Sequence, residues 1–471
     1  MRSKQSENIF TLAAVISMAV SLIPGLAAGR SQQDARALTD SLSTVYEQPA
    51  DPLGRLGANP GLEDYLSYAA LQSPALKAAF YRWLSLVEKS GYTGSLPDPT
   101  LTYGYFVEPV ETRVGPQIQR LSLRQAFPWF GTLRAQQDVV SEAAWSAYQK
   151  FESEKLKLFY RVKAAYYDYY FLGRNLAITR DNLELLTFWE SVARAKYRVA
   201  LTQHPDVIKA QVELGKLEDQ LLSLEDMLEP AATRLRSVLN LPDSVAVPMP
   251  TEIHVDETAI DADSITALVL TVNPDLKSIT HLIAKEEAER RLAGKRSWPN
   301  FALGLDYIDT GPAIDPTMED SGKDAWAVSA GLSIPLWFGK SKAQKREAEA
   351  RHRAAQHEYL DAKANLRALI EKVLYQYEDA LRKTRLYRDG LVPKAEQALN
   401  ASYTAYQAGE TDFLNVLDAQ RQLLDFQLMF ERSRTDLAMH GAEIEMITGK
   451  ELTNNIDDEN GHRHDGEDGR Q

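Results

Sequence analysis

The sequence predicts a mainly helical chain with a small β part, made of two copies of a unit that contains a helix, a β-hairpin, a very long helix and a further helix. Three observations support this fold class. Short motifs recur in the same order about 200 residues apart, four segments alternate with period two, and two stretches of nearly seventy residues are almost free of proline.

The duplication is visible in five pairs of matching motifs. Their offset grows from 200 to 209 residues, and it grows only where a loop could lengthen. The pairs are Ser73–Lys77 with Asn273–Lys277, Pro99 with Pro299, Trp129–Gly131 with Trp337–Gly339, Tyr197 with Tyr406, and Ala210–Gln211 with Ala419–Gln420. Because all five pairs are in register, chance is a poor explanation, and we expect both copies to share one internal architecture.

Each copy begins with a helix at a Ser/Asn-Pro signal. Ser73 and Asn273 can each cap a helix with the side chain, and the proline that follows suits the first turn, where no backbone donor is needed. A β-hairpin then follows in both copies.

The hairpin segments alternate between large apolar and small or polar residues. The large residues are Leu101, Tyr103, Tyr105 and Val107, then Phe301, Leu303, Leu305 and Tyr307, then Trp326, Val328, Ala330, Leu332 and Ile334. Such alternation over about ten residues is typical of transmembrane β-barrel strands. The alternative is half of a soluble sandwich. The segment 117–125 fits least well, because Arg120 and Arg124 must then face a lumen.

Two very long helices follow the hairpins. Residues 132–200 contain no proline, and residues 340–408 are interrupted only by Pro393. At about 1.5 Å per residue each reaches on the order of 100 Å, which a compact domain cannot house. A coiled-coil wall or tube can.

These patterns divide the chain into six segments. In order they are a signal peptide (1–28), an N-terminal extended segment (29–60), a first repeat (61–240), a linker (241–260), a second repeat (261–450) and a disordered acidic tail (451–471). The first repeat holds a hairpin at 99–127, a long helix at 132–200 and a helix at 206–240. The second holds a hairpin at 299–335, a long helix at 340–408 and a helix at 412–449.

Composition and motif searches argue against several functional classes. The chain has no cysteine, which excludes disulfides and thiolate sites. A net charge of −13 argues against a nucleic-acid partner. The eight histidines are scattered, His352 and His357 stand five residues apart rather than four, and no phosphate-binding glycine loop occurs. We therefore predict neither an enzyme nor a cofactor.

Taken together, the export signal, the duplicated unit, the two hairpins and the long helices resemble the TolC-type outer-membrane efflux family over about residues 60–450. The most specific local matches are the Trp-Phe-Gly turns and the helix break Tyr406–Thr411, which is followed by Asn415–Gln420. The resemblance implies a homotrimer that forms a 12-stranded barrel in the outer membrane and a long α-helical tunnel in the periplasm.

The resemblance also implies two groups of functional residues. At the membrane interface these are the turns Trp129, Phe130, Gly131 and Trp337, Phe338, Gly339, where glycine permits a sharp exit and tryptophan suits the interface. At the periplasmic tip they are His204, Asp206, Gly409, Thr411, Asn415 and Asp418. An acidic ring there would bind cations, although Asn415 stands where the family often has a second acid.

The implied partners are a periplasmic adaptor, an inner-membrane pump of the resistance-nodulation-division type and outer-membrane lipid. The Trp-Phe-Gly turns resemble those of the heavy-metal branch of the family (cobalt-zinc-cadmium and copper-silver exporters). This resemblance implies that metal cations are the cargo. His462 and His464 in the acidic tail are the candidate metal ligands. A type I secretion or drug-efflux channel and a soluble periplasmic coiled-coil scaffold or adaptor are the alternatives.

Overall fold

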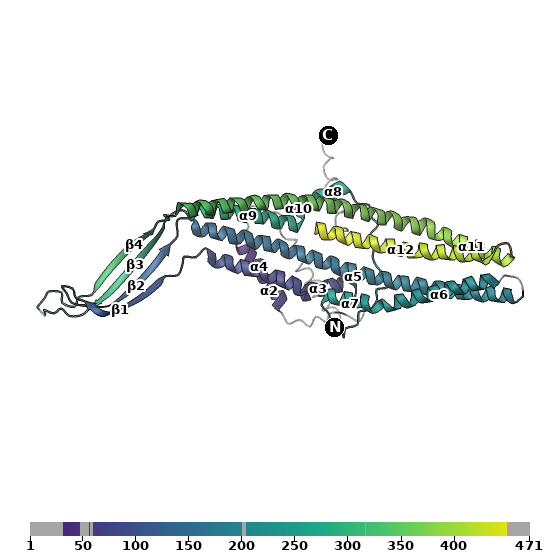
Figure 1. The fold of residues 1–471 in the computed structure, drawn as a ribbon, viewed down its shortest axis with the longest axis horizontal. Coiled ribbons are helices and arrows are strands. Elements are labelled where there is room, and N and C mark those ends of the chain that lie inside the picture. Colours follow the sequence, from purple (N-terminus) through teal and green to yellow (C-terminus); the bar gives the residue numbers. More distant parts are fainter. Residues whose placement is uncertain (1–31, 48–55, 57–59, 200–203, 316, 450–471) are drawn as a thin grey trace, which may run out of the picture.

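The computed structural model describes residues 32–47, 56, 60–199, 204–315 and 317–449. The molecule is elongated, with a sheet at one end, two helical tips at the other and the short helices gathered around the middle (Figure 1). The predicted signal peptide, the acidic tail and residues 200–203 of the first tip lie outside the described residues. The fold class, mainly helical with a small sheet, is confirmed.

The two copies repeat the same order of elements. The first copy contains α3 (Leu62–Gln72), α4 (Pro74–Thr93), β1 (Thr100–Val110), β2 (Gln117–Phe127), α5 (Thr132–Arg198), α6 (His204–Asp226) and α7 (Leu228–Leu239). The second contains α8 (Ala262–Val272), α9 (Pro274–Lys295), β3 (Asn300–Thr310), β4 (Ala325–Ser333), α10 (Phe338–Leu386), a π-helical turn η2 (Tyr387–Leu391), α11 (Val392–Ala408) and α12 (Phe413–Thr448).

Matching caps start α4 and α9. The Leu76 amide donates to Ser73 Oγ at 3.3 Å, and the Leu276 amide donates to Asn273 Oδ1 at 3.1 Å. In each copy the proline occupies the first helical position, where its missing N–H costs nothing. The capping expected from the sequence is therefore confirmed in both copies.

One antiparallel sheet joins the copies, in the order β1-β2-β3-β4. The hairpin of the first copy pairs with that of the second through β2 and β3, from Gln117 opposite Thr310 to Phe127 opposite Phe301. Within the protomer β1 and β4 are the edges of this sheet. Both edges therefore have backbone groups free for a further strand.

The long helix α5 is the central element of the packing. Its 67 residues span roughly 100 Å and contact α3, α4, α6, α7, α9 and α12. At the crossing with α9, Ser146 Oγ donates to the Ser278 carbonyl and Ser278 Oγ donates to the Ser146 carbonyl, both at 3.0 Å. These small residues let the helices of the two copies approach closely.

Two expectations about local structure are wrong. Residues 32–47 form the helix α2 rather than an extended segment, because Ala35, Thr39 and Leu42 lie on one face and are buried near α4. The helix expected over 206–240 is two helices, separated at Met227. Pro230 has no amide to donate to the Asp226 carbonyl, which is where α6 ends.

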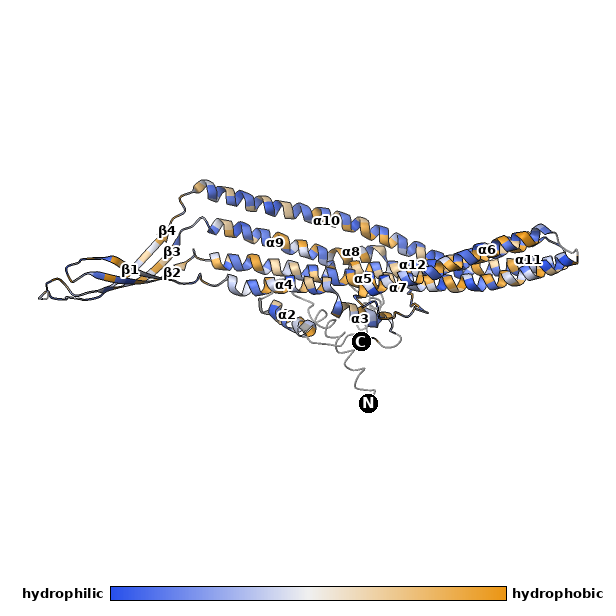
Figure 2. Cartoon of the chain, turned by 60° about the horizontal axis from the view of Figure 1, so that its bottom comes forward, coloured by the Kyte–Doolittle hydropathy of each residue, from blue (hydrophilic) through white to orange (hydrophobic). Residues whose placement is uncertain are grey.

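The second long helix is not a single α-helix. Pro393 cannot bond to the carbonyl four residues before it, and the chain accommodates this with the π-helical turn η2 between α10 and α11. In Figure 2 the half of α10 near the sheet is coloured mainly hydrophilic, whereas α6 and α11 carry both colours.

No helix among the described residues combines the length and the apolar character needed to cross a lipid bilayer.

Candidate functional site

The sheet has one large apolar face, as the strand register shows. The Cα atoms of Tyr103, Leu121, Tyr307 and Trp326 form one row across the four strands, and those of Leu101, Leu123, Leu305 and Val328 form another. Residues opposite each other in neighbouring strands share a face, so these side chains form one continuous surface. It is exposed to an unusual degree, 67% for Trp326 and 82% for Val328. An exposed apolar face of this size marks a surface for lipid or for a partner.

Two rows that contain aromatic residues cross this apolar face. Tyr307 and Trp326 lie 5.0 Å apart between ring centroids in one row, and Phe127 pairs with Phe301 in another. Six residues separate Tyr307 from Phe301, so the two rows are about 20 Å apart at a rise of roughly 3.3 Å per residue. Rows this far apart fit within the apolar band of an outer-membrane barrel, which is about 25 Å tall and is flanked by aromatic residues.

The opposite face of the sheet is small and polar. Thr102, Ser122, Asp306 and Ala327 form one of its rows. Arg120 Nη2 lies 2.7 Å from Asp306 Oδ1, and Ser122 donates a short hydrogen bond to the same oxygen. Arg120 therefore lies on the polar face, as the strand pattern requires.

Trp129 of the first interface turn lies in an aromatic stack. Its ring stacks on Trp298 at 4.9 Å and on Phe301 at 5.7 Å, and its amide donates to Asn300 Oδ1 at 3.1 Å. Gly131 has a φ of 73°, which favours glycine, and α5 starts directly after it. We did not identify Trp298 from the sequence, because it has no counterpart in the first copy.

The second interface turn differs from the first. Trp337 and Phe338 are exposed, at 78% and 70%. The role expected for Gly339 is wrong, because Gly339 lies in the first turn of α10 with no positive φ. The chain instead enters α10 through Trp337, whose backbone is neither helical nor left-handed.

At the second tip, Gly409 ends α11 with a φ of 81° and Asp412 caps α12. The Asn415 amide donates to Asp412 Oδ1 at 3.3 Å, and the Asn415 side chain donates to Thr411 Oγ1 in a short hydrogen bond. Thr411 therefore bonds a side chain rather than capping the helix. These contacts give the break between the helices a defined geometry.

An ion-pair network joins helix α12 of the second tip to helix α6 of the first tip. Arg421 Nη1 lies 3.1 Å from Asp418 Oδ1, and Arg421 Nη2 lies 2.5 Å from Glu213 Oε1 on α6. Hydrogen bonding from Arg421 lowers the pKa of Glu213 below its ordinary value. Arg421 was missed in the sequence, although it lies only three residues after Asp418. It offsets the charge that the acidic-ring hypothesis assigns to Asp418.

The two tips hold their matching tyrosines differently. Tyr406 is 3% exposed and packs against Phe413, while Lys196 Nζ donates to its carbonyl at 2.7 Å and lies over its ring. Tyr197 is 44% exposed and its ring lies 5.2 Å from that of His204. Asp206, in the first turn of α6, is half-buried. The tip residues of the two copies therefore lie in unlike environments.

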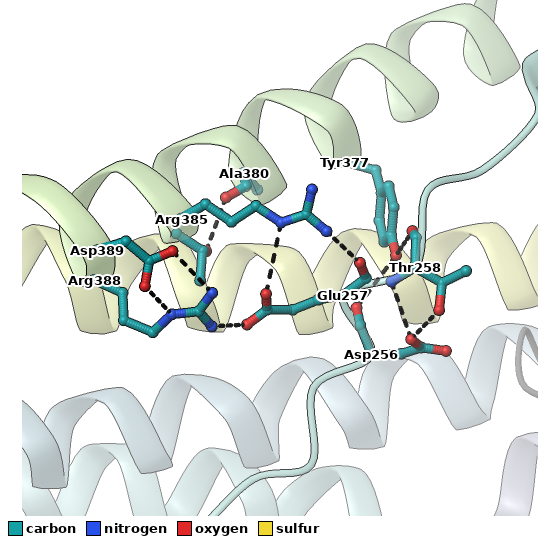
Figure 3. A network of polar contacts seen from close by, with 9 residues as sticks. Asp256, Glu257, Thr258, Tyr377, Ala380, Arg385, Arg388 and Asp389 are labelled. Carbon is teal, nitrogen blue, oxygen red and sulfur yellow. Dashed lines mark hydrogen bonds and ion pairs between the residues drawn. The ribbon is translucent and has the colours of Figure 1, made fainter.

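A third polar network fastens the chain segment 256–258 to the second long helix (Figure 3). Arg388 bonds Glu257 and Asp389, Arg385 Nη2 donates to the Glu257 carbonyl at 2.7 Å, and Tyr377 Oη donates to the Thr258 carbonyl at 3.0 Å. Burial, with nearby Asp256 and Glu257, raises the pKa of Tyr377 to about 12. The network lies where α10 meets η2.

No group of three or more potential metal ligands occurs among the described residues. His462 and His464 lie outside them.

Comparisons with known proteins agree with this geometry. Residues 266–450 match the family model described as Outer membrane efflux protein. Nodulation protein T of Rhizobium leguminosarum bv. trifolii is 22% identical over 374 residues, or 75% of this chain and 78% of that protein. Outer membrane protein TolC of Vibrio cholerae is 21% identical over 322 residues, or 66% and 72%. Cobalt-zinc-cadmium resistance protein CzcC of Cupriavidus metallidurans is 30% identical, but over only 101 residues, or 21% and 24%.

The fold matches solved structures more extensively than the sequence does. The outer membrane protein VceC of Vibrio cholerae covers 85% of this chain and 99% of its own, with a TM-score of 0.68 and 19% identity. Residues 266–450 therefore resemble the outer membrane efflux protein family, and the chain has the fold of the outer membrane protein VceC.

Proposed function

We propose that this protein is the outer-membrane channel of a tripartite efflux system, carrying solutes from a periplasmic adaptor and inner-membrane pump to the exterior. The observation that carries the proposal is the exposed apolar face of a four-stranded sheet with two open edges, at the end of a helical body roughly 100 Å long. A soluble scaffold would leave this face in water, which is why we set that alternative aside.

Three copies would complete the structure. Four strands cannot close a barrel, but β4 of one protomer can pair with β1 of the next, and three protomers then give twelve strands. The apolar face would contact lipid, and the helices would extend into the periplasm as a tunnel. TolC-type channels are homotrimers that work with adaptors and pumps; a pump of the resistance-nodulation-division type is our proposal for this chain.

Cross-linking tests the assembly directly, because the natural chain has no cysteine. A variant with both Thr102→Cys and Ala327→Cys has one thiol on each edge strand. A flexible bismaleimide should give cross-linked dimers and trimers in outer-membrane fractions, whereas either single substitution should give far fewer. Exclusively monomeric bands from the double variant, together with no conductance in planar bilayers, would refute the channel.

The tip is the proposed periplasmic gate. If Asp418 forms a ring around the threefold axis, its Arg421 partner reduces the cation selectivity of that ring. Arg421→Ala should then increase cation selectivity in planar bilayers, and Asp418→Ala should decrease it. Equal selectivity in both variants and the natural channel would exclude the ring. The roles of His204, Asp206, Gly409, Thr411 and Asn415 in the gate and in adaptor docking remain proposals of the same kind.

We also propose that the channel transports metal cations. This proposal is motivated by the turn motifs and by the short match to the cobalt-zinc-cadmium resistance protein. Deletion of the gene should lower tolerance to cobalt, zinc or cadmium if this is right. Unchanged tolerance combined with sensitivity to organic solutes would support the drug-efflux alternative instead.

A further inference from the structure

The polar face of the sheet carries an unequal set of charges. In the three rows of this face that contain Thr100, Thr102 and Gly104, the charged residues are Arg120, Arg124 and Asp306, and all the others are uncharged. Two cations and one anion leave one net positive charge for each protomer. In a chain whose net charge is −13, this local excess of positive charge calls for an explanation.

Arg120 pairs with Asp306, the one anionic residue in these rows. Arg120 bonds Asp306 Oδ1 through Nε at 3.2 Å and through Nη2 at 2.7 Å, and Ser122 bonds the same oxygen. This cross-strand pair ties β2 to β3 and is a sufficient structural role for Arg120. Arg124 acts on Asp306 only through longer-range electrostatics, and among the described residues it makes no ion pair of its own.

Arg124 is exposed, and among the described residues no ion pair joins it to a carboxylate. Its row consists otherwise of Thr100, Gly304 and Ser329, so no large side chain shields it on either side. A Cβ added to Gly331 would lie 3.1 Å from Arg124 Nη2, so the guanidinium extends over the glycine of β4. The neighbouring strands thus provide an open surface on which a planar, five-donor group lies accessible.

We propose that Arg124 forms an anion-binding ring in the lumen of the barrel and that the exit of the channel favours solutes bearing carboxylate or phosphate groups over the metal cations considered above. The inference rests on the proposed trimeric channel, in which three symmetry-related guanidinium groups lie at one level. Guanidinium binds carboxylate and phosphate through two parallel hydrogen bonds, which makes arginine the suited side chain for such a ring. Rings of basic side chains select anions in pores by the same electrostatics.

Citrate is a suitable probe, because each of its carboxylates can accept two parallel hydrogen bonds from a guanidinium, and it can reach the barrel from the outside without passing the tip. Isothermal titration of the detergent-purified trimer should detect citrate binding. Arg124→Gln should weaken that binding by roughly tenfold or more, because charge-assisted hydrogen bonds are lost. In planar bilayers, citrate added on the barrel side should reduce the current of the natural channel and not that of Arg124→Gln.

Two variants keep the test specific. Arg124→Lys keeps the charge and should retain block by citrate, with weaker binding because the bidentate geometry is lost. Arg113→Gln removes a cation of the same hairpin outside the paired rows and should leave citrate binding unchanged. Conducting channels in which Arg124→Gln binds citrate as the natural protein does would overturn the inference. Failure to form any channel would instead contradict the proposed function itself.

Discussion

The long helix of the first copy and that of the second have the same place in the repeat but differ in packing. Helix α5 is uninterrupted and is buried along most of its length. Helix α10 buries only Ala348 and Ala355 before Ile370 and then passes into the π-helical turn η2 before α11. Duplication has therefore kept the architecture while one copy supplies the packed body and the other an open, interrupted helix.

The difference continues to the tips and the interface turns. The buried Tyr406 and the exposed Tyr197 are equivalent in sequence, and so are the left-handed Gly131 and the helical Gly339. Matched substitutions in the two copies can therefore separate the contribution of the fold from that of the local environment.

The tyrosine pair should show the largest contrast. Tyr406→Ala empties a buried site beside Phe413 and should destabilise the tip by about 3–5 kcal/mol, the range for large aromatic truncations. Tyr197→Ala, at a half-exposed ring, should cost below about 1 kcal/mol. Thermal unfolding followed by circular dichroism at the helix band measures both. Equal losses would show that the tips are packed alike.

The glycine pair should give effects of opposite sign. Gly131→Ala forces a left-handed backbone on a residue with a Cβ and should cost about 1–2 kcal/mol. Gly339→Ala lies in a helix, with nothing within 4 Å of the added carbon, and should stabilise by about 0.5–1 kcal/mol. Shifts of the melting temperature in the same direction for both would contradict the assigned conformations.

The network of Figure 3 should limit the local opening of the π-helical turn η2. Glu257→Gln removes the carboxylate that binds Arg388, so the amides of Tyr387–Leu391 should exchange hydrogen roughly fivefold faster. Mass-spectrometric hydrogen exchange of the natural and variant proteins measures this. Glu347→Gln, which removes an exposed ion pair within α10, is the matched control and should leave these amides unaffected.

The contribution of the Glu213–Arg421 ion pair to stability should depend on pH. Because the pKa of folded Glu213 is lowered, its contribution to stability is present above the ordinary value of 4.5 and is lost as pH falls through the lowered pKa. Glu213→Gln should therefore lower the melting temperature at pH 7, and this effect should shrink as pH falls below the ordinary value and through the lowered pKa. Arg421 is partly exposed, so we expect at most about 1 kcal/mol at neutral pH. A difference independent of pH would exclude the ionised bridge.

Much of the architecture was predictable because it depends on local patterns. Strand alternation identified the apolar face, and the Ser/Asn-Pro signals identified the starts of α4 and α9. The turn residue Gly409 was predictable because the left-handed conformation favours glycine. Pro230 also indicates the helix break at Met227, although we did not predict that break from the sequence.

The sequence by itself determined the duplication, the helical and strand character of each segment and the presence of one apolar sheet face, since these depend on residue spacing. Only the tertiary structure decided which charges meet. Glu213 and Arg421 are 208 residues apart, and Arg120 and Asp306 are 186 apart. Such contacts arise from packing one copy against the other, so no local pattern encodes them. The same holds for Arg124, whose place among small residues of the neighbouring strands became visible only when the four strands were in register.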